Sequence, residues 1–96
     1  MQKGNYYVYT TRNPGKTVLY TGVTNDLLRR LLEYYKNRGS KKNFAGKYYC
    51  YKLLYYEYFT DINQAIHIEK DIKNLNREKK EELIRNKNPN WNFLTV

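Results

Sequence analysis

The sequence predicts a small α+β domain in the order β-β-α-β-α-α. Three observations predict it: two short β-rich segments around a turn signal, one strongly β-type run in mid-chain, and helical periodicity after capping residues. With 96 residues and a hydrophobic content of 41%, the chain suits one domain, residues 1–96, with one small core.

The strands come from three segments. Residues 6–11 alternate and are rich in β-formers, Asn13-Pro14-Gly15 is a turn signal, and residues 17–23 form the second strand. These two segments predict an antiparallel hairpin. Residues 51–60 form a third strand that ends before Asp61.

The helices follow capping residues. A cap within residues 24–26 starts a helix that reaches residue 36, Thr60 or Asp61 caps a helix over 62–75, and Asn76 caps one over 77–85. In the first helix, the side chains expected to face the core are Leu27, Leu28, Leu31 and Tyr34 or Tyr35. Pro89 ends the last helix, and the residues expected to pack the tail on the core are Trp91, Phe93 and Leu94.

The net charge of +9 indicates a polyanionic partner or merely a soluble basic protein. Positive charge is densest where it interleaves with glycine and tyrosine, at Lys36, Arg38, Lys41, Lys42 and Lys47. A flexible basic loop of this kind suits a nucleic-acid backbone, and a plain solvated loop is the alternative. No apolar run approaches the ~20 residues of a membrane span, so we expect no membrane partner. The lone Cys50 fits a reducing, cytoplasmic location. The oligomeric state is not predicted.

One carboxylate lies on an apolar helix face. Glu69 falls within the stripe of Ile62, Ala65, Ile66 and Ile72. An unpaired buried carboxylate costs several kcal/mol, so Glu69 needs a metal ion, an arginine or a proton. A structural pair with an arginine such as Arg30 is the competing interpretation. His67 lies on the opposite face, where we expect solvent exposure and no ligand role.

The first helix carries a second constellation. Arg30 and Tyr34 are four residues apart, so they share a face and can contact one phosphate together. Arg29 points elsewhere. The alternative places Tyr34 in the core and leaves Arg30 as a surface cation.

The order and spacing of Tyr7-Val8-Tyr9, Tyr20-Thr21-Gly22, Arg30 and Glu69 resemble the GIY-YIG nuclease superfamily. The nearest likeness is to small stand-alone bacterial proteins of that family. The further matching segments are residues 21–25, 28–30, 55–57, 65–66, 69–70, 72–73 and 88–91.

The resemblance implies a three-stranded antiparallel sheet flanked by helices and a metal-dependent endonuclease that hydrolyses DNA phosphodiester bonds. A domain of this size contacts only a short stretch of nucleic acid, mainly through phosphates, so we expect low sequence specificity. We also expect selectivity for DNA structure in repair or recombination, with RNA still open as a substrate. Tyr9 and Tyr20 would position or deprotonate the attacking water, and the residues alone do not decide which is the base. Arg30 would neutralise the scissile phosphate. Glu69 would hold one divalent cation, Mg²⁺ or alternatively Mn²⁺.

Two positions extend or depart from the family pattern. Tyr34 takes the place of a frequent histidine, which removes a group that titrates near neutrality. Asn88 matches a late asparagine of the family. Two rival interpretations remain: a non-catalytic nucleic-acid-binding module that stacks bases on the tyrosine-rich third strand, and a basic scaffold that docks on an acidic protein.

Overall fold

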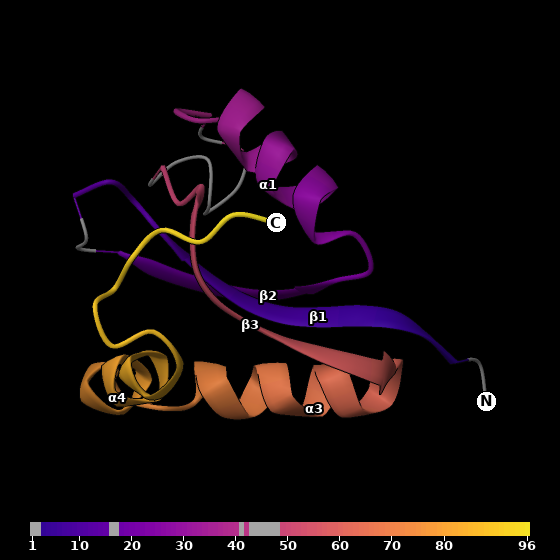
Figure 1. Cartoon of the computed structure of the whole chain (residues 1–96). Coiled ribbons are helices and arrows are strands. Elements are labelled where there is room, and N and C mark those ends of the chain that lie inside the picture. Colours follow the sequence, from indigo (N-terminus) through magenta and orange to yellow (C-terminus); the bar gives the residue numbers. More distant parts are fainter. Residues whose placement is uncertain (1–2, 16–17, 41, 43–48) are drawn as a thin grey trace.

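The computed structural model describes residues 3–15, 18–40, 42 and 49–96. Its elements are β1 (Lys3–Arg12), β2 (Leu19–Thr24), α1 (Leu27–Lys36), β3 (Lys52–Asp61), α3 (Ile62–Lys73) and α4 (Arg77–Lys87). The predicted order β-β-α-β-α-α is confirmed. The sheet forms the middle layer, with α1 on one face and with α3 and α4 on the other (Figure 1). No helix among the described residues is long and apolar enough to cross a membrane.

The three strands are antiparallel in the order β2-β1-β3, so β1 is central. Tyr9 lies opposite Gly22 of β2 and opposite Tyr56 of β3. Because successive strand residues point to opposite faces, Val8 turns toward α3 and Tyr9 toward α1. Both side chains are buried, as the central strand of a three-layer domain requires.

Each face of the sheet has its own core cluster. The cluster beneath α3 and α4 comprises Val8, Leu54, Tyr55, Ala65, Ile72 and Ile84. The cluster beneath α1 comprises Tyr9, Leu27, Tyr34, Cys50 and Leu53. Two of the five members on the α1 side are tyrosines, so this layer brings hydroxyl groups into the interior along with apolar area.

Side-chain caps set the start of each helix. Asp26, Asp61 and Asn76 accept hydrogen bonds from the backbone N–H groups of residues 29, 63 and 79. The helix ends differ slightly from the prediction, since α3 stops at Lys73 and α4 continues to Lys87.

One core prediction for α1 is wrong, as is that for Phe93 in the tail. Leu28 is 51% exposed, because the buried face of α1 runs through Leu27, Leu31 and Tyr34, and Leu28 is rotated by about 100° from Leu27. Of the two tyrosines left open, Tyr34 faces inward.

The chain after α4 returns across the sheet (Figure 1). The Asn88 amide donates to the carbonyl groups of Leu54 and Asn92, and the Leu94 N–H donates to the Leu53 carbonyl at 2.8 Å. Trp91 and Leu94 pack on the core as expected. Phe93 stays 40% exposed, with the Arg12 guanidinium over its ring.

Candidate active site

Three tyrosines from three elements meet between the sheet and α1. The hydroxyl groups of Tyr9 and Tyr34 are 2.5 Å apart and share a buried hydrogen bond. The Tyr20 ring stands edge-on to the Tyr34 ring, with 5.9 Å between centroids. Tyr9 is 1% exposed and Tyr20 is half-buried, so the phenol of Tyr20 is nearer to solvent. The two sequence-predicted phenols and Tyr34 therefore form one cluster.

A glycine on β2, Gly22, makes room for the Tyr9 phenol. A Cβ atom added at Gly22 would lie 2.5 Å from the Tyr9 hydroxyl oxygen and 2.8 Å from its Cζ. The Tyr9 ring thus crosses directly over the neighbouring strand at its register partner. The glycine is needed for close packing, which the sequence motif alone does not reveal.

We expect Gly22→Ala to destabilise the protein by about 1–3 kcal/mol, the usual range for overpacking a core. The Tyr9 ring cannot swing aside, because it is buried and bonded to Tyr34. Urea unfolding would measure the loss. Gly15→Ala is the matched control, since its Cβ would come no nearer than 3.5 Å to another group. Equal stability of both variants would contradict the packing role of Gly22.

Arg30 lies one helical turn before Tyr34 and faces the same cluster. Its Nε is buried and has no hydrogen-bond partner within the described part of the chain, and the nearest carboxylate oxygen, on Glu33, is 3.9 Å away. Burial lowers the pKa of Arg30, but the nearby phenols of Tyr9 and Tyr34 outweigh it and raise the pKa overall. Arg30 therefore keeps its charge and has an unused donor. Arg29 is more exposed and lies beside Glu33.

Glu69 approaches the cluster from α3, which packs against β1 and β2. Its side chain is 15% exposed, and its Oε2 lies 3.2 Å from the Nζ of Lys73, not beside Arg30. The same Nζ is 5.9 Å from the centroid of the Tyr20 ring. Lys73 was not among the sequence-predicted site residues. The signal that could have found it is its position four residues after Glu69.

Two phenols of the cluster, those of Tyr9 and Tyr34, have raised pKa values. Burial raises the pKa of Tyr9 to about 12, with the charges of Tyr20 and Glu69 adding to the rise and the Tyr34 hydrogen bond and Arg30 opposing it. Burial and the bond to Tyr9 also raise the pKa of Tyr34. The pKa of Tyr9 thus depends on all four other candidate side chains. At neutral pH, Tyr9 is a neutral hydroxyl unless a cation is added.

This raised pKa predicts a loss of stability at high pH. Tyr9 loses its proton near pH 10 in the unfolded chain and near pH 12 in the folded one. This difference in pKa contributes about 2–3 kcal/mol to the free energy of unfolding. The contribution is present below pH 10 and disappears as the pH rises through 12. We expect Tyr9→Phe to lose less stability than the unchanged protein over this interval. Identical slopes in urea unfolding at pH 9 to 12 would show that Tyr9 is not the group responsible.

The other predicted site residues lie outside the tyrosine cluster, and some of them make structural contacts instead. Asn88 uses its amide in the tail contacts above, so the geometry gives its predicted site role no support. Lys36, Arg38 and Lys42 are exposed, and Arg38 stacks on the Tyr35 ring at 3.9 Å. The predicted contacts at positions 41 and 47 fall outside the described residues.

A metal ion would find one carboxylate here. The described residues contain no group of three His, Cys, Asp or Glu side chains that could hold a metal ion, and Glu69 is the carboxylate whose charge acts on Tyr9. His67 is exposed and paired with Asp71, as its helix face predicts. Mg²⁺ fits such a site, because it keeps several waters and commonly takes only one or two protein carboxylates.

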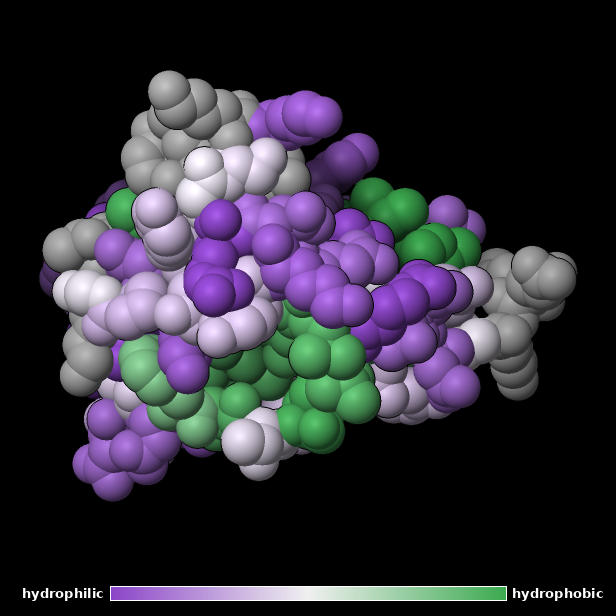
Figure 2. All heavy atoms as spheres, turned by 90° about the horizontal axis from the view of Figure 1, so that it is seen from above, coloured by the Kyte–Doolittle hydropathy of each residue, from purple (hydrophilic) through white to green (hydrophobic). Residues whose placement is uncertain are grey.

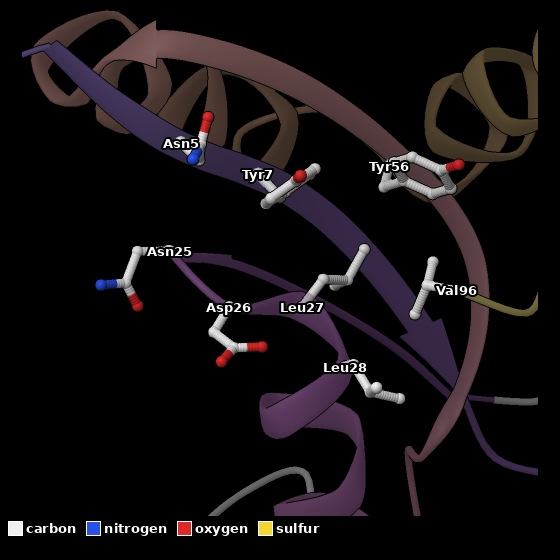
Figure 3. Close-up of a pocket in the computed structure, with 8 residues that line it drawn as sticks. All are labelled: Asn5, Tyr7, Asn25, Asp26, Leu27, Leu28, Tyr56 and Val96. Carbon is white, nitrogen blue, oxygen red and sulfur yellow. The ribbon is translucent and has the colours of Figure 1, made fainter.

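A separate pocket of about 430 Å³ opens on the α1 side of the sheet, between the start of α1 and β3 (Figure 3). Its lining includes Tyr7, Leu28, Tyr56 and Val96 but none of the five clustered candidates. Figure 2 shows hydrophobic side chains gathered on this face of the molecule. The pocket is thus apart from the tyrosine cluster.

Comparison with known proteins finds similarity in both sequence and fold. The family described as the GIY-YIG catalytic domain matches residues 5–82. A "UPF0213 protein" of Bacillus pumilus (strain SAFR-032) is 33% identical over 81 residues, which are 84% of this chain and 80% of that protein. The solution NMR structure of a UPF0213 protein from Bacillus halodurans covers 91% of this chain and 89% of its own, with 30% identity and a TM-score of 0.57.

Proposed function

The chain belongs to the GIY-YIG catalytic domain family, and from this and its geometry we propose that it is a metal-dependent endonuclease acting on DNA. Membership of a nuclease family implies a nucleic-acid substrate. The observation that supports the finer proposal is that Arg30, Glu69, Tyr20 and Tyr34 all influence the Tyr9 phenol. Binding alone does not need an arginine with a buried, unbonded Nε and a largely buried carboxylate around one phenol.

Arg30 would bind the scissile phosphate. Its buried Nε has no partner among the described residues, and a phosphate oxygen would supply one. A guanidinium offers forked donors and a permanent charge, so it stabilises the charge that develops on the phosphoryl oxygens. The phenol of Tyr34, one turn further on α1, would contact the same group.

Glu69 would hold one divalent cation, Mg²⁺ or Mn²⁺, on the α3 side of the cluster. When bound, such an ion stabilises phosphoryl charge and makes water a stronger nucleophile. Its charge would also offset the burial that keeps Tyr9 protonated. Tyr20, the phenol nearer to solvent, would orient the attacking water, and the hydrogen bond to Tyr34 would hold Tyr9 in place behind it.

Lys73 must give up its contact with Glu69 before the carboxylate can take a metal ion. Its side chain is 47% exposed, so it can move into solvent. We expect Lys73→Met to tighten Mg²⁺ or Mn²⁺ binding roughly two- to fivefold, since an exposed ion pair is worth about 0.2–1 kcal/mol. Calorimetric titration would measure this, with Lys70→Met as the control of equal charge on the same helix. Equal or weaker binding by the Lys73 variant would contradict a competing role.

A cleavage assay tests the proposed function. Branched, single-stranded and duplex DNA and an RNA of matched sequence would be incubated with the protein in Mg²⁺, in Mn²⁺ and in EDTA. We expect nicking that needs the metal, tolerates sequence changes and differs between DNA shapes. Absence of cutting on every substrate, with the metal bound, would overturn the nuclease proposal.

One observation favours a second candidate, a nucleic-acid-binding module without catalysis. Tyr56 and Tyr58 of β3 are 37% and 49% exposed, and both contact Tyr7 edge-on across the open part of the sheet. Exposed aromatic rings can stack bases. Salt-sensitive binding that is lost in a Tyr56→Ala, Tyr58→Ala double variant, with no cleavage by the unchanged protein, would establish this alternative.

A further inference from the structure

Arg12 is a buried cation without a carboxylate partner. Its side chain is 1% exposed, and no acidic group within the described residues forms an ion pair with it. One Nη donates to the Trp91 carbonyl at 3.2 Å, while the Nε is buried and unpaired in the same part of the chain. The guanidinium also lies 5.0 Å from the Trp91 ring centroid and 4.8 Å from that of Phe93.

These contacts offset only part of the cost of burying a charge. Each ring contributes about 2 kcal/mol when the cation is desolvated, and the carbonyl hydrogen bond adds a similar amount. Neither supplies a negative charge, and the desolvation of an ion costs several kcal/mol. Arg12 therefore leaves uncompensated positive potential at the end of β1.

That potential faces a shallow pocket of about 310 Å³, lined by Arg12, Arg77, Glu81, Arg85 and Trp91. Arg77, Glu81 and Arg85 follow at four-residue intervals, so they share one face of α4. Glu81 holds the Arg77 Nε at 2.8 Å and lies 3.8 Å from an Nη of Arg85. Two guanidinium groups thus flank one carboxylate, and Arg12 adds a third cation to the lining, so the lining carries more positive than negative charge.

We propose that this pocket binds a phosphate group of the nucleic-acid strand, away from the scissile bond. Guanidinium forks match phosphate oxygens better than any other side chain does. The pocket lies near the candidate active site along the chain: Arg12 pairs with Leu19, the residue before Tyr20, and α4 begins a few residues after Lys73. The identity of the strand rests on the proposed function, whereas the phosphate chemistry rests on the pocket.

The simpler explanation is that Arg12 only fastens the C-terminal tail. It accounts for the bond to Trp91 and the two ring contacts. It does not account for the two arginines that α4 brings to the same pocket, nor for the unpaired Nε. The two explanations differ in whether an added phosphate changes the surroundings of Trp91.

Trp91 is the single tryptophan of the chain, so its fluorescence reports on this pocket alone. The protein would be titrated in EDTA and low salt with an oligothymidylate that lacks terminal phosphates, and separately with inorganic phosphate. EDTA prevents cleavage, so binding here is measured independently of the nuclease proposal. We expect a saturable change with the oligonucleotide, weakened about tenfold by Arg85→Gln, because a charged hydrogen bond is worth about 1.5–3 kcal/mol.

Lys79→Gln is the matched control. It removes the same charge from the same helix, about 200° around the axis from Arg77, and should leave the Trp91 response unchanged. Equal weakening by both variants, or binding with no Trp91 response, would overturn the proposal. A Trp91 response to inorganic phosphate, with none to the oligonucleotide, would show that the bound phosphate does not belong to a nucleic-acid strand. A normal Trp91 response in a protein that cuts nothing would uphold the pocket and contradict only the nuclease activity.

Discussion

Replacing Glu69 with glutamine is expected to abolish metal-dependent cleavage, with a loss of about a thousandfold or more. The variant removes the carboxylate charge that would bind the cation and keeps nearly the same volume. Metal ions stabilise a phosphoryl transition state by several kcal/mol, and each 1.4 kcal/mol is a factor of ten in rate. The fold should survive, because the one ion pair of this carboxylate among the described residues is with Lys73, whose side chain is half exposed.

The measurement combines cleavage, metal titration and DNA binding on the same protein. Glu69→Gln should lose cutting and calorimetric metal binding together, while its affinity for DNA in EDTA stays within about threefold, since phosphate contacts carry that affinity. Glu82→Gln, an exposed carboxylate on α4, is the control. Full cleavage by the Glu69 variant, or loss of cutting with metal binding intact, would contradict the assignment of Glu69 as the metal ligand.

The sequence predicted those features that depend on near neighbours. The sequence predicted Asn76 as a cap and limited the other two caps to residues 24–26 and 60–61, because a cap bonds within three residues of itself; the structure selects Asp26 and Asp61. The burial of Glu69 followed from helical periodicity alone. The strand order could not be read from the residues themselves, because pairing of β3 with β1 joins segments some 50 residues apart. The family resemblance predicted a three-stranded antiparallel sheet, which is confirmed, and the strand order β2-β1-β3 is a finding of the structure.

The site's internal contacts depend on packing that periodicity does not encode. Glu69 could have met Arg30, a metal ion or a proton, and the structure pairs it with Lys73 instead. The hydrogen bond between Tyr9 and Tyr34 requires α1 to pack at a particular distance from β1. Gly22 makes this packing possible, because it leaves space for the Tyr9 ring. Burial of Arg12 was equally invisible, because a charged residue in a strand ordinarily predicts an exposed position.

Arg30→Ala is expected to lower cleavage by roughly 10²–10³-fold, the loss typical of removing one donor to a developing oxyanion. Arg29→Ala should stay within about threefold of the unchanged protein. The two residues carry the same charge and are adjacent in sequence, so general attraction for DNA is nearly equal in both variants. They differ in direction: the Arg30 Nε is buried and has no hydrogen-bond partner among the described residues, whereas Arg29 bonds to Asn25 on the surface.

Single-turnover cleavage at saturating metal separates this catalytic loss from weaker binding. Arg30→Lys should recover only part of the rate, because lysine keeps the charge but lacks the forked donors. In either alanine variant, the slope of the logarithm of DNA affinity against the logarithm of salt concentration should decrease by about one, the value for one phosphate contact. Equal losses of rate from Arg29→Ala and Arg30→Ala would mean that charge alone matters, and that the Arg30 guanidinium does not contact the scissile phosphate.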